Sequence, residues 1–218
     1  NLKVLIIADP AREPDYQLPG ARREGREVAS VFRNFPAKQH GIFIEVDEHI
    51  GPDQCDPVEI LALLLSGAFD IVHYAGHGGY DKDNPAGSGW IFGKDCVLSA
   101  REIFRARKVP RLVFANACFS AVTTQGLALS ADEQSKGLAS IAQAFFERGV
   151  SNYIGSGWPV NDEQATTLAR TFYDGLLKGQ PICDALKAGR AEIGGYGDTW
   201  GAYQHYGNPN DVVIKADK

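Results

Sequence analysis

Two residues that could perform nucleophilic catalysis, His77 and Cys118, each follow an apolar segment of the sequence. His77 lies in the stretch Asp70 to Gly79, DIVHYAGHGG, and Cys118 lies in Arg111 to Ala121, RLVFANACFSA. Each stretch opens with β-favouring residues over the length of a strand and then enters a turn. Two buried strands that end side by side would bring an imidazole and a thiol together. That pair is the minimum for a cysteine nucleophile with a general base.

The residues around this pair favour chemistry over a purely structural role. Free cysteine is among the most buried residue types, so packing is the alternative explanation for Cys118. Its small neighbours, such as Ala117 and Ser120, would let a substrate backbone approach. A glycine after His77 lets a peptide amide turn toward a bound carbonyl. The N–H groups of Gly78 and Cys118 are therefore candidates for an oxyanion hole.

We expect structural roles for the other histidine near these segments and for the remaining cysteines. His73 lies inside the first predicted strand, and we expect it to find partners in the core, as buried polar groups normally do. No third ligand falls at a suitable spacing near the two histidines, so we expect no metal. The other cysteines lack a neighbouring small-residue turn: Cys55, Cys96 and Cys183. Four dispersed cysteines predict neither a disulfide framework nor a zinc site, and they suit a reducing, cytoplasmic setting.

Composition narrows the possible classes of protein. The 218 residues, 44% of them hydrophobic, suffice for one large domain. A net charge of −5 with interspersed acids and bases argues against nucleic-acid binding. No run of about 18 apolar residues predicts a membrane span, and the opening NLKVLIIADP predicts a core strand rather than a signal peptide. Because the chain contains no methionine, we interpret it as a domain excised from a longer protein.

Strands and helices are predicted to alternate along the chain. Strands are predicted at 2–8, 41–46, 69–75, 111–115, 150–155 and after 200, with a small hairpin at 90–98. Helices are predicted at 21–35, 57–65, 137–148, 161–178 and 181–193, and a further one begins at Ser99 with Glu102 completing a capping box. This order predicts a single α/β domain with a mostly parallel sheet and helices on both faces.

The predicted sheet places the two chemical residues at one edge. Sites in such sheets form at the carboxyl ends of the strands, and His77 and Cys118 both follow strand ends. The long loops predicted at 76–89 and 116–136 leave from the same edge. We expect them to wall a cleft and to be the movable parts of the molecule.

The order of these motifs resembles a known family. DIVHYAGHGG followed by LVFANACFSA is similar to the paired His-Gly and Cys motifs of caspase-like (clan CD) cysteine peptidases, and most of all to the CHAT domain, which is often attached to TPR repeats. Three further stretches support the resemblance, which covers nearly the whole chain: Leu18 to Ala21, Gly149 to Asp162, and Trp200 to Pro209. It implies a caspase-like, six-stranded sheet sandwiched by helices.

The resemblance also implies roles for individual residues. Cys118 would attack a peptide carbonyl, His77 would act as base and acid, and the Gly78 N–H would lie in the oxyanion hole. Water would then hydrolyse the thioester, with no metal or organic cofactor. A third catalytic side chain is not evident in the sequence.

The pocket that would select the substrate residue is left open by the sequence. In the related fold, loops after the first and fifth strands line it, which gives Asp9, Arg12, Trp158 and Asp162 as candidates. An acid there favours a basic residue at the cleavage site, whereas Arg12 favours an acidic one. Asp162 is equally explained by the first turn of a helix, and Asp9 by a turn.

The resemblance implies a protein substrate and a regulatory region such as TPR repeats. A gasdermin-like substrate in bacterial defence or programmed cell death fits that implication. Two other classes compete with a peptidase. A caspase-like interaction module without catalysis would have no need of an intact His77 and Cys118. A nucleotide-binding α/β domain is disfavoured because GxGxxG and GxxxxGK[ST] are both missing.

Overall fold

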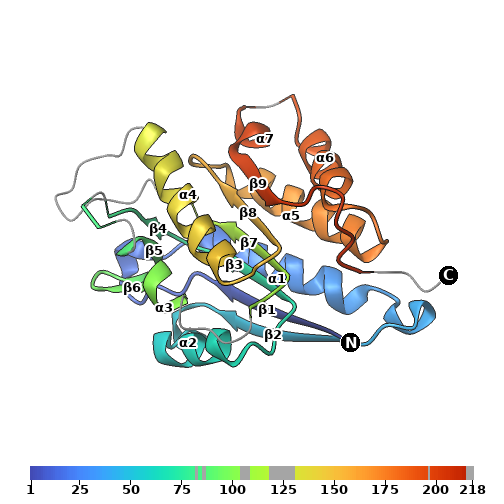
Figure 1. Ribbon diagram of the computed structural model, residues 1–218, viewed down its shortest axis with the longest axis horizontal. Coiled ribbons are helices and arrows are strands. Elements are labelled where there is room, and N and C mark those ends of the chain that lie inside the picture. The colour runs from blue at the N-terminus through green and yellow to red at the C-terminus, as the bar shows by residue number, and fades with distance from the viewer. Residues whose placement is uncertain (82, 85–86, 104–108, 118–130, 196, 215–218) are drawn as a thin grey trace.

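A computed structural model describes residues 1–218 except 82, 85–86, 104–108, 118–130, 196 and 215–218 (Figure 1). Its centre is a six-stranded sheet in the order β2-β1-β3-β7-β8-β9. The first five of these strands in sequence are parallel, and β9 runs antiparallel to β8. Their bounds are β1 Leu2–Ala8, β2 Ile44–Ile50, β3 Ile71–Ala75, β7 Leu112–Asn116, β8 Asn152–Ser156 and β9 Tyr203–Gly207. The predicted mixed α/β class with a mostly parallel six-stranded sheet is confirmed.

Helices cover both faces of this sheet (Figure 1). One core lies against α1 (Pro19–Asn34), α5 (Asp162–Leu177) and α6 (Ile182–Glu192). The other lies against α2 (Pro57–Ser66) and α4 (Ala131–Glu147). Successive strand side chains point to opposite faces, so the central strands β1, β3 and β7 are buried on both sides and their sequences are almost continuously apolar.

A smaller sheet lies beside the large one and shapes the turn after β3. It pairs β4 (Gly78–Gly79) with β5 (Gly89–Gly93) and β5 with β6 (Cys96–Ser99), all antiparallel. The predicted hairpin is thereby confirmed. Helix α3 (Ala100–Ile103) follows, and the Ser99 N–H and hydroxyl both donate to the Glu102 carboxylate at 2.6 Å. The short elements are η1 Pro14–Tyr16, η2 Ala37–His40, η3 Pro52–Gln54 and α7 Thr199–Ala202.

Several predicted boundaries are wrong. The second strand spans 44–50 rather than 41–46, and α4 begins at residue 131 rather than 137. The predicted loop at 76–89 contains the short strand β4. β2 is the outermost strand and carries acids at 45, 47 and 48, so no apolar run marks it. The first turns of α4 likewise contain no large apolar residue until Leu138.

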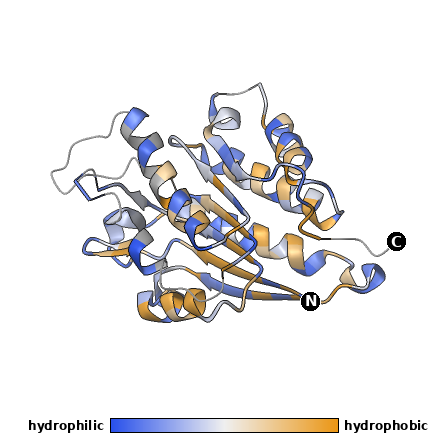
Figure 2. Cartoon of the chain, viewed as in Figure 1, coloured by the Kyte–Doolittle hydropathy of each residue, from blue (hydrophilic) through white to orange (hydrophobic). Residues whose placement is uncertain are grey.

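Helix starts and surface character follow from local sequence. Asp56 and Asn161 cap α2 and α5, because each side chain accepts hydrogen bonds from two backbone N–H groups of the first turn. Figure 2 shows α2 largely in the colour of apolar residues, and its Val58 is exposed. In the part of the chain that the structure describes, no helix is both long and apolar enough to cross a membrane.

Candidate active site

The ends of two neighbouring strands lead to the predicted chemical residues. β3 and β7 are parallel neighbours, with Ala75 opposite Asn116. The Gly76 N–H donates to the Asn116 carbonyl at 3.1 Å, so the segments that follow β3 and β7 leave the sheet side by side. His77 comes two residues after Ala75, and Cys118 comes two residues after Asn116. Cys118 itself lies outside the described residues.

The imidazole of His77 is held in one orientation by a backbone carbonyl. Its Nε2 lies 3.0 Å from the Tyr16 carbonyl oxygen. A carbonyl can only accept, so Nε2 carries the proton, and in the neutral ring Nδ1 is left as the acceptor. The Tyr16 ring also meets the imidazole edge-on, at 5.9 Å between centroids. Nδ1 is therefore the nitrogen that could take a proton from a nucleophile.

The surroundings of His77 favour its neutral form. Burial lowers the pKa of this imidazole, while the Tyr16 carbonyl and the negative charge of Asp9 act in the opposite direction. The net pKa is below the ordinary 6.5. A neutral imidazole near pH 7 can act as a general base.

The backbone of His77 is fixed from the core. Its carbonyl accepts from the Tyr74 hydroxyl at 2.8 Å and from the Ile91 N–H at 2.9 Å. Tyr74 is fully buried and stacks on Trp90 at 4.4 Å between ring centroids. A Cβ at Gly76 would lie 2.6 Å from the Tyr74 hydroxyl oxygen, so this turn needs glycine. The position of His77 thus depends on aromatic packing beneath it.

The Gly78 N–H faces away from its neighbouring strand. Gly78 is paired with Trp90, and the bond from the Ile91 N–H to the His77 carbonyl flanks that pair. In an antiparallel ladder this arrangement marks a pair that exchanges no hydrogen bonds with each other. The Gly78 N–H is therefore not used by β5 and could donate to an oxyanion.

The segment that carries Tyr16 is secured at both ends by Asp9. This carboxylate is 1% exposed, accepts from the Leu18 N–H at 2.7 Å and forms an ion pair with the Arg22 guanidinium. Asp9 has a φ of 50°, a left-handed conformation that Asp tolerates better than most residues. It directly follows β1, at the same edge of the sheet as the end of β3. The carboxylate that sequence offered as a substrate contact is thus already engaged with α1.

Two further contacts tie this segment to its surroundings. Arg12 is exposed and forms an ion pair with Asp56 at 3.4 Å. The Glu13 carboxylate accepts from the Lys94 N–H at 3.2 Å at the tip of the β5–β6 hairpin. A Cβ at Gly93 would lie 2.9 Å from the same carboxylate. Tyr16 therefore rests on a segment that the hairpin supports.

The other two candidates for a substrate pocket follow the carboxyl end of β8. Trp158 lies against α7, where a Cβ at Gly201 would be 3.4 Å from its ring. Asp162 is the first residue of α5, and its carboxylate covers the start of α1 so closely that a Cβ at Gly20 would clash with it. Both lie at the edge where β1 also ends. Their role in substrate binding stays a prediction.

The remaining histidine and cysteine residues lie apart from these groups. His73 is fully buried and contacts Tyr173 and Glu24. Cys55 is also buried, and this burial raises the pKa of its thiol to about 12, which leaves it unreactive at neutral pH. Cys96 and Cys183 are half-buried and unpaired with another cysteine. Among the described residues, no three His, Cys, Asp or Glu side chains group as metal ligands would.

Two residues of this region were not predicted. Tyr16 contributes a backbone carbonyl, a group that every residue has, so no sequence signal marks it. Glu24 is 2% exposed and contacts both His73 and Asn116. It precedes Val28 by four residues and therefore lies on the apolar stripe of α1. A carboxylate on the apolar stripe of a helix is visible in the sequence, and it could have indicated a buried polar contact.

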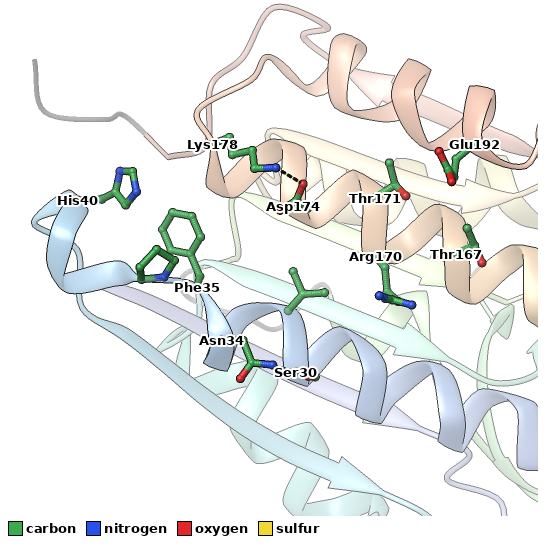
Figure 3. A pocket seen from close by; sticks show the side chains of 12 residues that line it. Ser30, Asn34, Phe35, His40, Thr167, Arg170, Thr171, Asp174, Lys178 and Glu192 are labelled. Carbon is green, nitrogen blue, oxygen red and sulfur yellow. Dashed lines mark hydrogen bonds and ion pairs between the residues drawn. The ribbon is translucent and has the colours of Figure 1, made fainter.

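A surface groove of about 720 Å³ lies at the opposite edge of the sheet. Figure 3 shows it between the end of α1 and the second half of α5, with Phe35 and His40 on one side and an ion pair of Asp174 and Lys178 on the other. Both helices run back from the carboxyl edge, so their ends mark the amino edge of the strands. The groove is therefore remote from His77.

Solved structures with a similar fold are cysteine proteases of the caspase fold. The Arg-specific cysteine proteinase gingipain R of Porphyromonas gingivalis has a TM-score of 0.62 and 13% identity over 98% of this chain and 48% of its own. The Drosophila initiator caspase Dronc has a TM-score of 0.53 and 10% identity over 94% and 78%. Separase in the Saccharomyces cerevisiae separase–securin complex has a TM-score of 0.51 and 14% identity, over 95% of this chain and 12% of its own. These likenesses define the caspase fold, and this chain spans about half the length of the gingipain chain.

The sequence itself places the chain in a particular family within that fold. Residues 2–208 match the CHAT domain, and the chain belongs to the CHAT domain family. No sequence match to a curated protein was found. The resemblance inferred from the His-Gly and Cys motifs is confirmed. Family and fold agree in placing the chain among CHAT domains of the caspase fold.

Proposed function

We propose that the chain is a cysteine endopeptidase in which Cys118 is the nucleophile and His77 is the general base and acid. The observation that carries the proposal is the hydrogen bond from the Gly76 N–H to the Asn116 carbonyl, which joins the two strand exits. His77 and Cys118 follow those exits by one and two residues respectively. The orientation of His77, with Nδ1 as the acceptor, adds the base that a thiol needs.

The proposed reaction has two balanced halves. Cys118 gives its proton to Nδ1 of His77, and its sulfur bonds to the peptide carbonyl carbon. The C–N bond breaks, and the same proton goes from Nδ1 to the leaving amine. Water then gives a proton to Nδ1 and its oxygen bonds to the thioester carbon. The C–S bond breaks, the acid product leaves, and the proton returns to sulfur.

The Tyr16 carbonyl has two effects on this cycle. It keeps Nε2 protonated, so that only Nδ1 exchanges protons during the reaction. It also accepts a stronger hydrogen bond from the imidazolium that forms in each half, because a charged donor bonds more strongly than a neutral one. The N–H groups of Gly78 and Cys118 would stabilise the oxyanion.

The substrate and setting belong to the same proposal. The substrate is a protein, and a TPR-like regulatory region controls its cleavage in the cytoplasm. A gasdermin-like protein in a bacterial defence or cell-death pathway is the substrate that the family suggests. Of the charged candidates for specificity, Arg12 and Asp162 are exposed, whereas Asp9 is paired with Arg22.

Cleavage of a peptide library tests the reaction. The wild type should cut a defined subset of peptides, and Cys118→Ala and His77→Ala should cut none of them. Cys96→Ala is the matched control, since it removes a half-buried free thiol elsewhere and should leave cleavage unchanged. Equal cutting by the wild type and Cys118→Ala would contradict the proposal. A biological effect that survives Cys118→Ala would instead favour a binding module.

A further inference from the structure

A chain of polar side chains, all of them buried except the half-buried Asn116, joins the two strands of the proposed site. The Glu24 carboxylate of α1 accepts from the Asn116 side-chain amide at 2.7 Å. Its other oxygen lies 3.2 Å from Nε2 of His73 in β3. Nδ1 of His73 lies 3.1 Å from the Tyr173 hydroxyl of α5. Glu24 is 2% exposed and His73 is fully buried, so water does not complete this arrangement.

The hydrogens of this chain can be assigned in one consistent direction. The Tyr173 hydroxyl can donate to Nδ1 of His73, and a proton on Nε2 then faces the Glu24 carboxylate. The Asn116 amide donates to the second carboxylate oxygen. The burial and the negative charge of Glu24 raise the pKa of Tyr173, which keeps its hydroxyl protonated. The contact between Nε2 of His73 and Oε1 of Glu24 is close at 3.2 Å but lacks hydrogen-bond geometry, so these two buried atoms have only each other as neighbours of opposite kind.

Stability alone gives no reason for a carboxylate at this place. A buried charge is expensive to desolvate, and apolar replacements of buried ionic groups are often neutral or stabilising. The Glu24 position lies on the apolar stripe of α1, where Val28 and Phe32 pack into the same core. What the carboxylate supplies, and an apolar side chain would not, is a directed bond to the end of β7.

That bond acts on the strand that leads to the nucleophile. Asn116 is the last residue of β7, and its carbonyl accepts from Gly76 while its side chain is held by Glu24. We infer that Glu24 is a positioning residue for the proposed peptidase site. Acting through Asn116 and His73, it holds the exits toward Cys118 and His77 in one relative position. This inference rests on the proposed function.

The amino edge of the sheet offers a matched control. The Asn152 side-chain amide donates to the Asp211 carboxylate at 2.8 Å, which is an asparagine–carboxylate bond of nearly the same length as that between Asn116 and Glu24. Asn152 is the first residue of β8, opposite the start of β7. Loss of this bond should affect stability without any effect on the exits of β3 and β7.

The test measures the reactivity of Cys118 without a peptide substrate. The rate of alkylation by iodoacetamide is followed by mass spectrometry of the Cys118 peptide at several pH values. A thiol paired with an imidazole reacts as a thiolate below the ordinary thiol pKa. In Glu24→Gln this rate at neutral pH should fall about 10- to 100-fold, because small displacements of paired reactive groups have effects of that size. Asp211→Asn should react at the wild-type rate.

A reciprocal exchange separates positioning from general loss of structure. Asn116→Asp alone places two carboxylates together and should also slow alkylation. Glu24→Gln alone leaves a weaker, neutral amide–amide pair at this place. The double variant Glu24→Gln with Asn116→Asp restores an amide–carboxylate hydrogen bond with the roles exchanged, and it should react faster than either single variant. A double variant as slow as the slower single one would overturn the inference. Thermal unfolding of each variant shows whether it is folded. If Glu24→Gln does not fold, the alkylation rate of Asn116→Ala, which removes the same hydrogen bond from its other side, takes its place in the test.

The outcomes distinguish this inference from the proposed function. If His77→Ala is alkylated at Cys118 as fast as the wild type, the pair does not exist and the proposed function fails. If His77→Ala is slower but Glu24→Gln equals the wild type, only the positioning role of Glu24 fails. If Asp211→Asn is slowed as much as Glu24→Gln, the effect is general and the inference also fails.

Discussion

The two edges of the six-stranded sheet each contain an asparagine bonded to a carboxylate, and the two carboxylates have different surroundings. At the carboxyl edge, Asn116 bonds to Glu24, which is itself buried and also faces His73. At the amino edge, Asn152 bonds to Asp211, which is half-buried on the segment that follows β9. The two bonds thus have similar lengths, but the Glu24 carboxylate is shielded from water and the Asp211 carboxylate is not.

The difference in access to water decides what each bond can do. If the amino-edge bond is lost, water can solvate Asp211, and the segment after β9 retains the bond from the Arg111 guanidinium to the Val213 carbonyl at 2.8 Å. If the carboxyl-edge bond is lost, Glu24 stays in the core with one partner fewer. A bond to a buried carboxylate limits the positions that its elements can adopt, whereas a bond to a half-buried carboxylate adds mainly to stability. Four variants or conditions can break or sharpen this contrast.

The largest effect is expected for Asp9→Ala at the carboxyl edge. It leaves the partly exposed Arg22 without its buried partner and the Leu18 N–H without an acceptor. The free energy of unfolding should fall by about 3 kcal/mol, the lower end of the range for breaking a buried ion pair. Urea denaturation measures this loss. Asp211→Ala at the amino edge should cost about 1 kcal/mol, and equal losses would remove the contrast.

The next largest effect is expected when the pH is lowered, because each edge contains a histidine whose pKa differs from its ordinary value. Burial lowers the pKa of both His77 and His205 below 6.5, and the charge of Arg190 adds to the effect on His205. The unfolded chain therefore binds more protons, so stability should decline as the pH falls through 6.5 and level off below the folded-state pKa values. His205→Gln should remove part of this decline. It should leave unchanged the pH profile of Cys118 alkylation, and a shift of that profile would link the edges.

A smaller effect is expected for Tyr74→Phe. This change removes one donor to the His77 carbonyl, while the Ile91 N–H and the stacking on Trp90 remain. Chemical denaturation should show a loss of about 1 kcal/mol, as for one hydrogen bond. Alkylation of Cys118 should change little. A slowing as large as that of Glu24→Gln would show that Tyr74 also positions the site.

The smallest effects are expected for one exposed ion pair at each edge. Arg12 pairs with Asp56 at the carboxyl edge, and Lys178 pairs with Asp174 beside the groove of Figure 3. Arg12→Ala and Lys178→Ala should each lower the melting temperature only slightly, since exposed pairs contribute about 0.5 kcal/mol or less. Arg12→Ala has a second readout in the peptide library. A changed cleavage preference there would assign Arg12 to the substrate pocket.

The fold could be predicted from sequence wherever burial leaves a pattern. β1, β3 and β7 are buried on both faces, and their apolar runs mark them clearly. β2 is an edge strand with only one neighbour, so its charged residues obscure it. The CHAT resemblance rested on motifs at strand ends, which is why the family could be identified although several boundaries were wrong.

The candidate site could be predicted only as far as side chains define it. The sequence marks His77 and Gly78 because an imidazole and a glycine are chemically distinctive. The Tyr16 carbonyl that orients His77 comes from a segment 61 residues earlier, and a backbone group carries no signature. Glu24 was missed for another reason, since a glutamate in an amphipathic helix is normally assigned to the exposed face. The roles of Cys118 and the substrate-pocket candidates stay predictions.

The acidic outermost strand has a consequence for how the protein behaves at high concentration. Within the described part of the chain, β2 has a neighbour on only one side, which leaves backbone N–H and C=O groups open along its other side. Its acids at 45, 47 and 48 lie near Lys3, His49 and Arg33 respectively, and they would also face the same acids on any second copy approaching in register. Repulsion of this kind opposes sheet extension between molecules. Neutralising these acids should therefore promote aggregation of folded protein while the site at the carboxyl edge stays intact.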